Sequence, residues 1–581
     1  MHSGPRRALF WPVALAVAVA GVLLAYDAGR GNSATMDEPF HAMAGAEYAI
    51  GGTCFANLEH PPLAKLLAGF SLRLAGAHGP RISHPFSVAT SEQPRPWLFS
   101  GVPLSPDALL AAARRPFYGL FFLLVLAVAG AVRGWGGDLA GLGAAALIAF
   151  EPTHLAHAAV VHTDVAASLG FFGTIALTLA ALERRSFVLW SAVGAALGAT
   201  LAAKFSAVLL VPVVATLALV VALLDRRRAW QEGRQADGRP VPGLLLALGV
   251  AGAVLLGSYS VAMRAMSRAD AESAVRSFLN SREAPASTIE KVVALSRLLP
   301  PAGHYAAGLA GVEIQNRTGG GVNFLRGRLS TNGFWDYFFV AFGMKTAVGF
   351  LVVLFAGGCV LVLRRVRFDR TLAALLIPTL YLFVSGMATS YNIGIRHILP
   401  AFPLLAAAAG IALARALTPR AAAGILLLGA GLEVAEVARV HPHEMSFFNL
   451  LAGGPARGEA WLNDSNLDWG QDLSRLGLEM KRRGEEASVT VAYFGGDEPA
   501  YRLPRARIFD PTRPGASPGL YAISSFLLCC GPETLAFHGD LTDARGLERL
   551  RALLRDRGTP AGRVGYSIHL VRIPGASEPE R

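Results

Sequence analysis

The sequence predicts a polytopic α-helical membrane protein with a small C-terminal α/β domain. Of its 581 residues, 53% are hydrophobic and 16% are charged, and the apolar residues gather in runs too long for a soluble core. These runs predict about eleven transmembrane helices, at 8–25, 112–132, 136–150, 165–182, 187–202, 206–224, 242–262, 336–363, 371–388, 395–414 and 421–438.

The charges between the runs predict the topology. The first run follows Arg6 and Arg7 without a clear cleavage site after it, so we interpret it as a retained signal anchor with a cytoplasmic N-terminus. The segments then assigned to the inside hold 16 basic and 6 acidic residues, whereas the short outer connections hold two basic residues, Lys204 and Arg396. The positive-inside rule therefore predicts a multi-pass protein of the inner or plasma membrane with its C-terminus outside. It also accounts for the net charge of +12 without a nucleic-acid partner.

Two long outer loops and a terminal domain complete the predicted organisation. Residues 1–440 form the predicted membrane domain, whose loops at 26–111 and 263–335 lie outside. Near residue 441 the apolar runs stop, and short alternating stretches separate two helical patterns. Residues 441–581 are therefore predicted to form an outer α/β domain.

The polar motifs all fall on the predicted outer side. Asp37 and Glu38 follow the first run, and Glu59-His60-Pro61-Pro62 and Lys65 follow in the same loop. Asp164 begins the fourth run, Lys204 separates the fifth from the sixth, and Arg396-His397 begins the tenth. Ionisable groups at a membrane edge are costly, so these residues are candidates for a functional site.

Each candidate also has a structural interpretation. Lys204 and Lys345 can extend their ammonium groups to the interface instead of binding an anion. The polar loop around Asn466 and Asp468 can be a network of helix caps and turns. Asp37 itself can cap a short helix that starts near Pro39, and the histidines near Asp164 can be polar residues facing the interface.

Other chemistries find little support in the sequence. Cys54, Cys359, Cys529 and Cys530 do not form a disulfide framework. No P-loop, nucleophile elbow or dinucleotide fingerprint occurs in a suitable context, so no nucleotide is expected. Carboxylates, amides and cations must then carry any chemistry.

Together these motifs resemble the GT-C superfamily of polyprenyl-phosphate-sugar-dependent glycosyltransferases, and in particular the protein O-mannosyltransferases and aminoarabinose transferases. The resemblance rests on Asp37-Glu38, His60-Pro61-Pro62-Leu63 with Lys65, Asp164, Lys204-Phe205-Ser206 and Arg396-His397-Ile398-Leu399-Pro400. The run from Ser446 to Leu473 is similar to a bacterial branch of that superfamily. The C-terminal domain is not the one found in the eukaryotic O-mannosyltransferases.

The resemblance implies a lipid-phosphate-linked hexose or pentose as donor and a hydroxyl acceptor, on a protein or an envelope glycolipid, on the outer face. Displacement with inversion needs a base, for which we assign Asp37 with Glu38 beside it. The leaving phosphate needs cations. We assign this part to Arg396, Lys204, Lys345 and His397, and a substrate-contacting or supporting part to His60, Lys65, Asp164, Asn466 and Asp468. We predict that Glu59, with His60 or Asp164, binds a divalent metal, Mg, Mn or Zn.

Two other classes of function remain open from the sequence. A transporter or flippase for an anionic lipid or ion would also need acids and cations in an outward cavity, although the sequence shows no inverted repeat. A non-catalytic subunit that assembles envelope enzymes is the third alternative.

Overall fold

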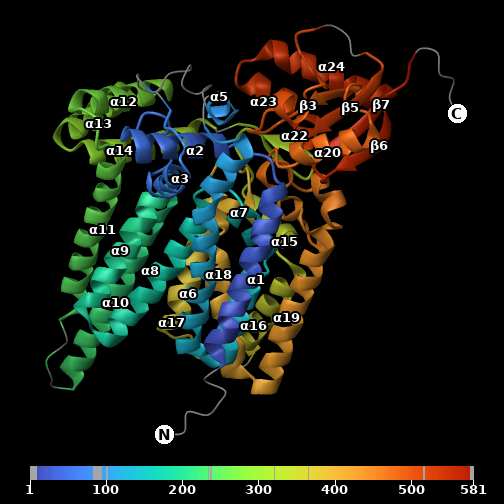
Figure 1. Cartoon of the computed structure of the whole chain (residues 1–581). Coiled ribbons are helices and arrows are strands. Elements are labelled where there is room, and N and C mark those ends of the chain that lie inside the picture. Colours follow the sequence, from blue (N-terminus) through green and yellow to red (C-terminus); the bar gives the residue numbers. More distant parts are fainter. Residues whose placement is uncertain are drawn as a thin grey trace.

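The computed structural model describes residues 9–80, 82, 94–99, 103–232, 235, 238–319, 321–363, 366–513 and 517–575. Of the basic residues used for the topology, Arg6, Arg7, Arg234, Arg364 and Arg365 lie outside these ranges. The described part is a bundle of long helices with a smaller mixed region at one end (Figure 1).

Every predicted apolar run is helical over most of its length, which confirms the predicted fold class. Seven described segments are long and apolar enough to cross a membrane: α1 (Phe10–Gly31), α6 (Pro106–Ala149), α8 (Asp164–Arg184), η3 with α10 (Phe205–Leu209, Leu210–Gln231), α11 (Pro240–Ala262), α17 (Arg370–Met387) and α19 (Pro419–Val440). The remaining runs form a bent pair and two shorter apolar helices, α9 (Phe187–Ala203) and α18 (Ala401–Ala416).

Helix α6 accounts for two predicted runs. Its path is broken at Gly137, whose φ of 86° and ψ of 178° only glycine adopts readily. A Cβ on Gly141 would lie 2.7 Å from the carbonyl oxygen of Ala129, so the two parts of α6 fold back against each other. The separate runs at 112–132 and 136–150 are thus two packed helical segments.

The eighth and tenth runs differ from simple crossings. Helix α15 (Tyr337–Lys345) and α16 (Val348–Leu363) meet at an angle of 113°. The tenth run starts as a 3₁₀ turn, η4 (Ile395–Ile398), and α18 begins only at Ala401. Proline is favoured at a helix start and disrupts a helix interior, so Pro400 suits the boundary and leaves Arg396 in the turn before it.

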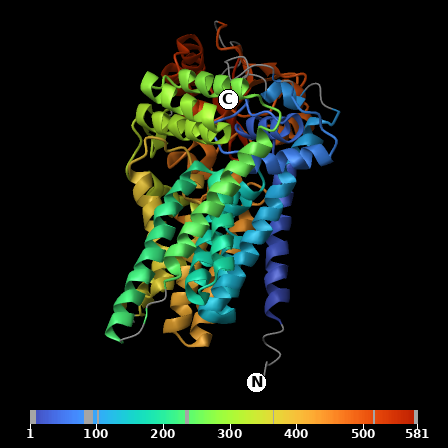
Figure 2. The same cartoon turned by 90° about the vertical axis from the view of Figure 1, so that its left-hand side faces the viewer.

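The predicted outer loops lie together at the end of the bundle that also carries the C-terminal region, opposite the N-terminus (Figures 1 and 2). The first loop forms α2 (Glu38–Ala46), η2 (Glu47–Gly51), α3 (Leu63–Leu74) and α5 (Pro94–Phe99). The second forms α12 (Arg268–Ser281), α13 (Ala286–Leu298), α14 (Pro300–Thr318) and the hairpin β1 (Asn323–Leu325) and β2 (Arg328–Ser330). Helix α7 (Pro152–Ala158) precedes α8.

The C-terminal region holds a five-stranded sheet in the order β4-β3-β5-β7-β6. The strands are β3 (Val489–Ala492), β4 (Arg507–Ile508), β5 (Gly519–Ser524), β6 (Thr559–Val564) and β7 (Ile568–Ile573). Strand β3 pairs in parallel with β4 and β5, and the other pairs are antiparallel. The helices are α20 (Leu473–Arg483), α21 (Pro499–Arg502), α22 (Ser525–Cys529), α23 (Gly531–Phe537) and α24 (Leu541–Arg557).

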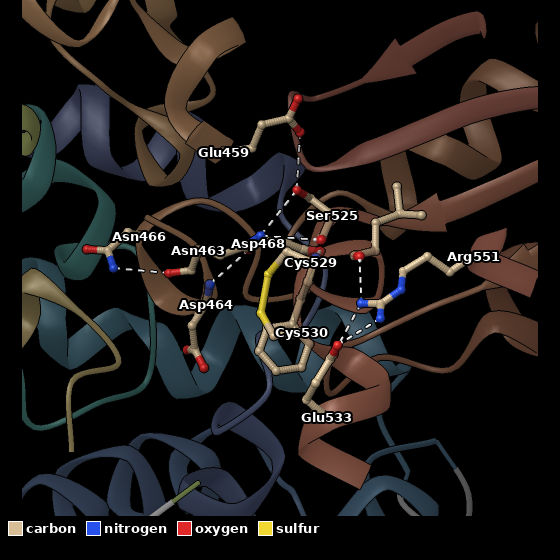
Figure 3. The surroundings of a disulfide bond; sticks show 12 residues. Glu459, Asn463, Asp464, Asn466, Asp468, Ser525, Cys529, Cys530, Glu533 and Arg551 are labelled. Atoms are coloured by element: carbon tan, nitrogen blue, oxygen red, sulfur yellow. Dashed lines mark hydrogen bonds and ion pairs between the residues drawn. A yellow bond between two sulfur atoms is a disulfide. The ribbon is translucent and has the colours of Figure 1, made fainter. Parts of the chain in front are cut away.

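A linking segment of 3₁₀ turns joins the bundle to this sheet. It contains η5 (Glu444–Ser446), η6 (Leu450–Ala452), η7 (Pro455–Ala460) and η8 (Asp464–Asn466). Phe447, Phe448 and Leu467 belong to the same apolar core as the long helices, whereas the sheet has cores of its own. The boundary at residue 441 remains a prediction. Cys529 and Cys530 are joined by a disulfide beside the polar loop of η8 (Figure 3).

Candidate active site

Asp37 lies immediately before α2 and faces a cluster of charged groups. Its Oδ2 is 3.3 Å from Nη1 of Arg396 and 3.4 Å from Nε2 of His162. Asp37 makes no side-chain capping hydrogen bond to α2, so the capping interpretation is not realised. One third of its side chain (33%) is exposed. Burial alone would raise the pKa of the carboxyl, but the positive charge of Arg396 holds this pKa well below its ordinary value.

Arg396 is buried in the turn η4, where Trp469 covers its guanidinium and His162 accepts a hydrogen bond from it. Its guanidinium carbon lies 4.4 Å from the ring centre of Trp469, a cation–π distance. Nη1 also lies 2.8 Å from Nε2 of His162. Arginine has no acceptor, so this contact requires a lone pair on Nε2 and places the His162 proton on Nδ1.

A chain of polar contacts extends from His162 into the bundle. Nδ1 of His162 lies 2.8 Å from Oδ2 of Asp164, and Nζ of Lys204 lies 2.6 Å from Oδ1 of the same carboxylate. The structure therefore brings Asp37, Arg396, Asp164 and Lys204 into one network. His162 is the residue that links them.

The C-terminal region contributes directly to this network. The backbone N–H of Met36 donates to the carbonyl of Trp469 at 2.9 Å, and that of Ser33 donates to Gln471 at 2.9 Å. These bonds fix the segment before Asp37 against the segment that carries Trp469. Asp464 lies close enough to Arg396 and Asp37 for their charges to affect it, and burial raises its pKa to about 7.

Glu38 occupies a different environment from its neighbour. Arg114 binds its carboxylate with two hydrogen bonds, Nε to Oε1 at 2.7 Å and Nη2 to Oε2 at 2.6 Å. The backbone N–H groups of Thr35 and Val161 donate to the two oxygens at 2.9 and 2.8 Å. The side chain of Glu38 is 1% exposed. Its hydrogen-bonding capacity is used to join α2 to α6 and to the loop before α8.

The other two predicted lysines hold backbone oxygens. Nζ of Lys65 donates to the carbonyls of Asn57 and His60 at 2.5 and 2.7 Å, and burial lowers its pKa to about 7. Nζ of Lys345 donates to the carbonyls of Met445 and Asn466 at 3.0 and 2.5 Å. Both ammonium groups are buried. Lys345 therefore does not extend its ammonium group to an interface, the alternative that the sequence left open for Lys345 and Lys204.

Asn466 and Asp468 support the site from behind. Oδ1 of Asn466 accepts from the backbone N–H of Ile395 at 3.0 Å, next to Arg396, and its Nδ2 donates to the hydroxyl of Tyr337 at 2.9 Å. Asp468 accepts from the N–H of Phe526 at 3.0 Å, which ties the loop to the C-terminal region (Figure 3). These contacts resemble the predicted turn network, and they also position the residues beside them.

His397 and Glu59 are placed differently from the core of the network. His397 is half-buried between the rings of Phe338 and Tyr391, at centroid distances of 6.2 and 6.1 Å. Glu59 forms an ion pair with Arg282 of α12. His60 lies nearer to the network, with its ring centre 5.6 Å from that of His162.

A group of three histidines has the geometry to hold a metal ion. Among the described residues, one group of three metal-ligating side chains has its ligand atoms all within 4.8 Å of one another: His41, His60 and His162. Of the predicted ligands, His60 belongs to this group, whereas Glu59 pairs with Arg282 and Asp164 pairs with Lys204.

The sequence interpretation missed His41 and Trp469 as site residues, and it treated His162 as an interface residue. His41 lies four residues after Asp37 in a predicted helix, a spacing that places both on one face, so a signal was available. For Trp469 the surrounding polar loop gave no sign that an aromatic ring covers a distant arginine.

An apolar groove lies between α10 and α17. Its volume is about 380 Å³, and its lining is almost entirely apolar, with Pro212 and Val213 on α10 and Ile377, Leu380, Tyr381 and Val384 on α17. Helix α10 follows Lys204 in the chain and α17 precedes Arg396. The groove therefore lies between the two helices that lead to the cations.

Comparison with known proteins finds several solved structures that are similar to this chain. It is similar to a S. cerevisiae protein O-mannosyltransferase complex bound to the sugar donor, at 19% identity and a TM-score of 0.36, over 48% of this chain and 37% of that one. It is also similar to ArnT from Cupriavidus metallidurans bound to undecaprenyl phosphate, at 14% identity and a TM-score of 0.46, over 100% of both chains.

A third similar structure is the Archaeoglobus fulgidus oligosaccharyltransferase in complex with Zn and sulfate, at 12% identity and a TM-score of 0.43, over 92% of this chain and 70% of that one. No family model and no curated protein sequence matches the chain. These solved structures belong to the group that the sequence motifs resemble. We base the functional proposal on the residues of this chain.

Proposed function

We propose that this chain is a membrane glycosyltransferase that moves a sugar from a polyprenyl-phosphate donor to a hydroxyl acceptor, with inversion at the anomeric carbon. One observation carries the proposal: the partly exposed carboxylate of Asp37 lies 3.3 Å from the buried guanidinium of Arg396. A displacement of this kind needs a base for the incoming hydroxyl and a cation for the leaving phosphate. The pair supplies both at one end of an apolar bundle.

Arg396 binds the phosphate in this mechanism. Its planar fork matches two phosphate oxygens, and stacking on Trp469 fixes the plane of the fork. Lys204, held by Asp164, adds positive potential behind it. When the phosphate engages the guanidinium, the contact between Arg396 and Asp37 weakens and the Asp37 carboxylate becomes available to the acceptor.

Asp37 receives the proton of the acceptor. Because its pKa is held low, the carboxylate is ionised but weakly basic, and it accepts the proton late, as the new carbon–oxygen bond forms. That bond forms on the face of the anomeric carbon opposite the phosphate while the bond from this carbon to the phosphate oxygen breaks. The configuration inverts, and the phosphate leaves with the electron pair against Arg396.

The apolar groove suits the lipid part of the donor. We assign the first isoprene units to the groove between α10 and α17, because it is apolar and lies between the helices that lead to Lys204 and Arg396. Glu38, Lys65, Asn466 and Asp468 hold the backbone around the site in this scheme. We do not assign them a contact with the sugar.

We further propose that the site faces out of the cytoplasm, as the distribution of basic residues predicts. A topology reporter fused after Gly454 should be active outside the cytoplasm, and one fused near Arg227 should be active inside. A cytoplasmic signal after Gly454 would overturn this orientation.

A deletion strain tests the activity. Mass spectrometry of its envelope glycans and glycoproteins should show the loss of one sugar modification, and re-expression of the wild type should restore it. The Asp37→Asn variant, at equal membrane abundance, should not. A transporter would instead show dependence on an ion gradient, and an assembly subunit would tolerate Asp37→Asn.

A further inference from the structure

Three histidine side chains that the proposed reaction does not use converge beside Asp37. His41 comes from α2, His60 from the loop before α3, and His162 from the loop before α8. The ring centre of His41 lies 4.7 Å from that of His162 and 5.0 Å from that of His60. The ring centres of His60 and His162 are 5.6 Å apart. Three separate segments thus bring imidazole nitrogens to one point.

The surroundings of the three rings also favour a ligand. His41 and His162 are buried, and His60 is half-buried. Nδ1 of His41 is buried and has no hydrogen-bond partner in the described part of the chain. Such an unsatisfied nitrogen is costly unless a ligand occupies it.

His162 is oriented as metal-binding histidines usually are. Its Nδ1 lies 2.8 Å from Oδ2 of the Asp164 carboxylate, and a carboxylate behind a ligating imidazole fixes the tautomer and the ring plane of that imidazole. Nε2 is then directed toward the cluster, where it accepts from Arg396 at 2.8 Å. A bound ion competes with Arg396 for this lone pair, and a phosphate that draws Arg396 away relieves the competition.

We propose that His41, His60 and His162 form a zinc site, with Asp37 as the nearest carboxylate. Zinc bound by imidazoles at about 2.0–2.1 Å needs its ligand nitrogens roughly 3.3 Å apart, so the nitrogens, now within 4.8 Å, must approach by at most about 1.5 Å. Small rotations of the side chains achieve this. The carboxylate of Asp37, whose Oδ2 is 3.4 Å from Nε2 of His162, stays outside the ligand set as the base, and its negative charge offsets that of Arg396.

The donor set favours zinc over the other predicted metals. Three imidazoles suit Zn²⁺, whereas Mg²⁺ and Mn²⁺ prefer oxygen ligands. Of the ligands predicted from the sequence, which were Glu59 with His60 or Asp164, only His60 belongs to this site. Asp164 acts here through His162, and Glu59 takes no part.

Direct measurement of metal content tests the site independently of any transfer activity. The protein is purified in nanodiscs without a polyhistidine tag, treated with chelator, incubated with ZnCl₂ and desalted. We expect about one zinc per chain for the wild type, and a rise in the thermal unfolding midpoint with added zinc, since a ligand that binds the folded state stabilises it. Co²⁺ in place of Zn²⁺ should give visible absorption bands of a four-coordinate nitrogen-rich site.

Single variants sharpen the test. His41→Asn and His60→Asn should each weaken zinc binding by roughly 10–100-fold and remove most of the thermal shift. His78→Asn, which changes an exposed histidine of the same loop, is the matched control and should bind like the wild type. The proposal is overturned if the wild type binds no zinc, or if a folded His41→Asn/His60→Asn double variant binds it as tightly as the wild type.

Discussion

Two acid–arginine pairs begin with adjacent residues, Asp37 and Glu38, at one end of the bundle. They differ in how much hydrogen-bonding capacity their carboxylates keep for a substrate. In the closed pair, Glu38 and Arg114, both carboxylate oxygens are saturated by the guanidinium and by backbone N–H groups, and both side chains are almost fully buried. In the open pair, Asp37 and Arg396, a single contact of 3.3 Å joins the charges, and the carboxylate is partly exposed. Adjacent residues on one helix thus serve different purposes.

The difference follows from the cost of buried charge. A buried charge with all its hydrogen bonds satisfied contributes to a unique structure and has nothing left to offer a substrate. The charges of the open pair are stabilised by contacts with His162 and Trp469 and by the partial exposure of Asp37 to water. This compensation is incomplete, so the pair can still bind a substrate. We infer that the closed pair positions α2 and the open pair performs chemistry.

The largest expected effect is that of Asp37→Asn on turnover. The amide keeps the shape of the side chain but cannot accept the proton, so turnover should fall by roughly 10²–10⁴-fold. Donor binding and the unfolding midpoint should change little, because Asp37 makes no capping bond. Initial rates in proteoliposomes measure this. A fully active variant would show that the open pair is structural after all.

Arg396→Lys should follow in size. Lysine keeps the charge but loses the planar fork and much of the stacking on Trp469, so we expect a loss of roughly 2–4 kcal/mol in transition-state stabilisation, or about 30–10³-fold in kcat/KM. Arg264→Lys is a matched control, since Arg264 donates to backbone carbonyls of residues 48–50, away from the network. Near-normal turnover of the Arg396 variant at normal abundance would remove this residue from the site.

Glu38→Gln should reverse the pattern seen at Asp37. Removing one charge of a buried pair leaves Arg114 uncompensated, which costs about 3–5 kcal/mol of stability, and the unfolding midpoint should fall clearly below that of Asp37→Asn. Turnover per folded molecule should fall less than tenfold. If Glu38→Gln instead kept its midpoint and lost turnover, the assignments of the two acids would have to be exchanged.

The sequence predicted the helices well because hydrophobic length is a local property. It placed a break at 133–135, close to Gly137, which reverses the chain, but it treated 336–363 as one crossing although α15 and α16 meet at 113°. Lys345, the sole charged residue between positions 337 and 363, lies at the bend. Its partners are carbonyls of residues about a hundred positions away, which no local pattern reveals.

The site was predicted only in part, because some of its contacts join residues that are far apart in the sequence. Motifs identified Asp37, Asp164, Lys204 and Arg396, which the structure joins in one network. The type of residue could not separate Lys204, which faces this network, from Lys65, whose ammonium is used by carbonyls of its own loop. Nor could it show that the C-terminal loop places Trp469 on Arg396, because that contact depends on packing between distant segments.

The smallest expected effect concerns Asp464, which the C-terminal loop places near the open pair. Its pKa is raised to about 7, chiefly by burial, so the group is neutral in acid and gains a negative charge as pH rises through 7. That charge competes with the donor phosphate for Arg396, while the phosphodiester of the donor keeps its own charge throughout. Donor affinity should therefore fall by roughly threefold to tenfold, about 1 kcal/mol, between pH 6 and pH 8.

Asp464→Asn cannot ionise and should bind the donor with the same affinity at both pH values, close to that of the wild type at pH 6. Binding of undecaprenyl phosphate is unsuited to this measurement because its monoester titrates in the same range, so the ligand should be a polyprenyl-phosphate sugar. A pH dependence that persists in the Asn variant would assign the effect to another group. If the pH dependence disappears in the Asn variant, the C-terminal loop changes the charge around the open pair as well as positioning it. The closed pair does not permit such an effect, because Arg114 and Glu38 already bind each other and Glu38 also binds backbone N–H groups.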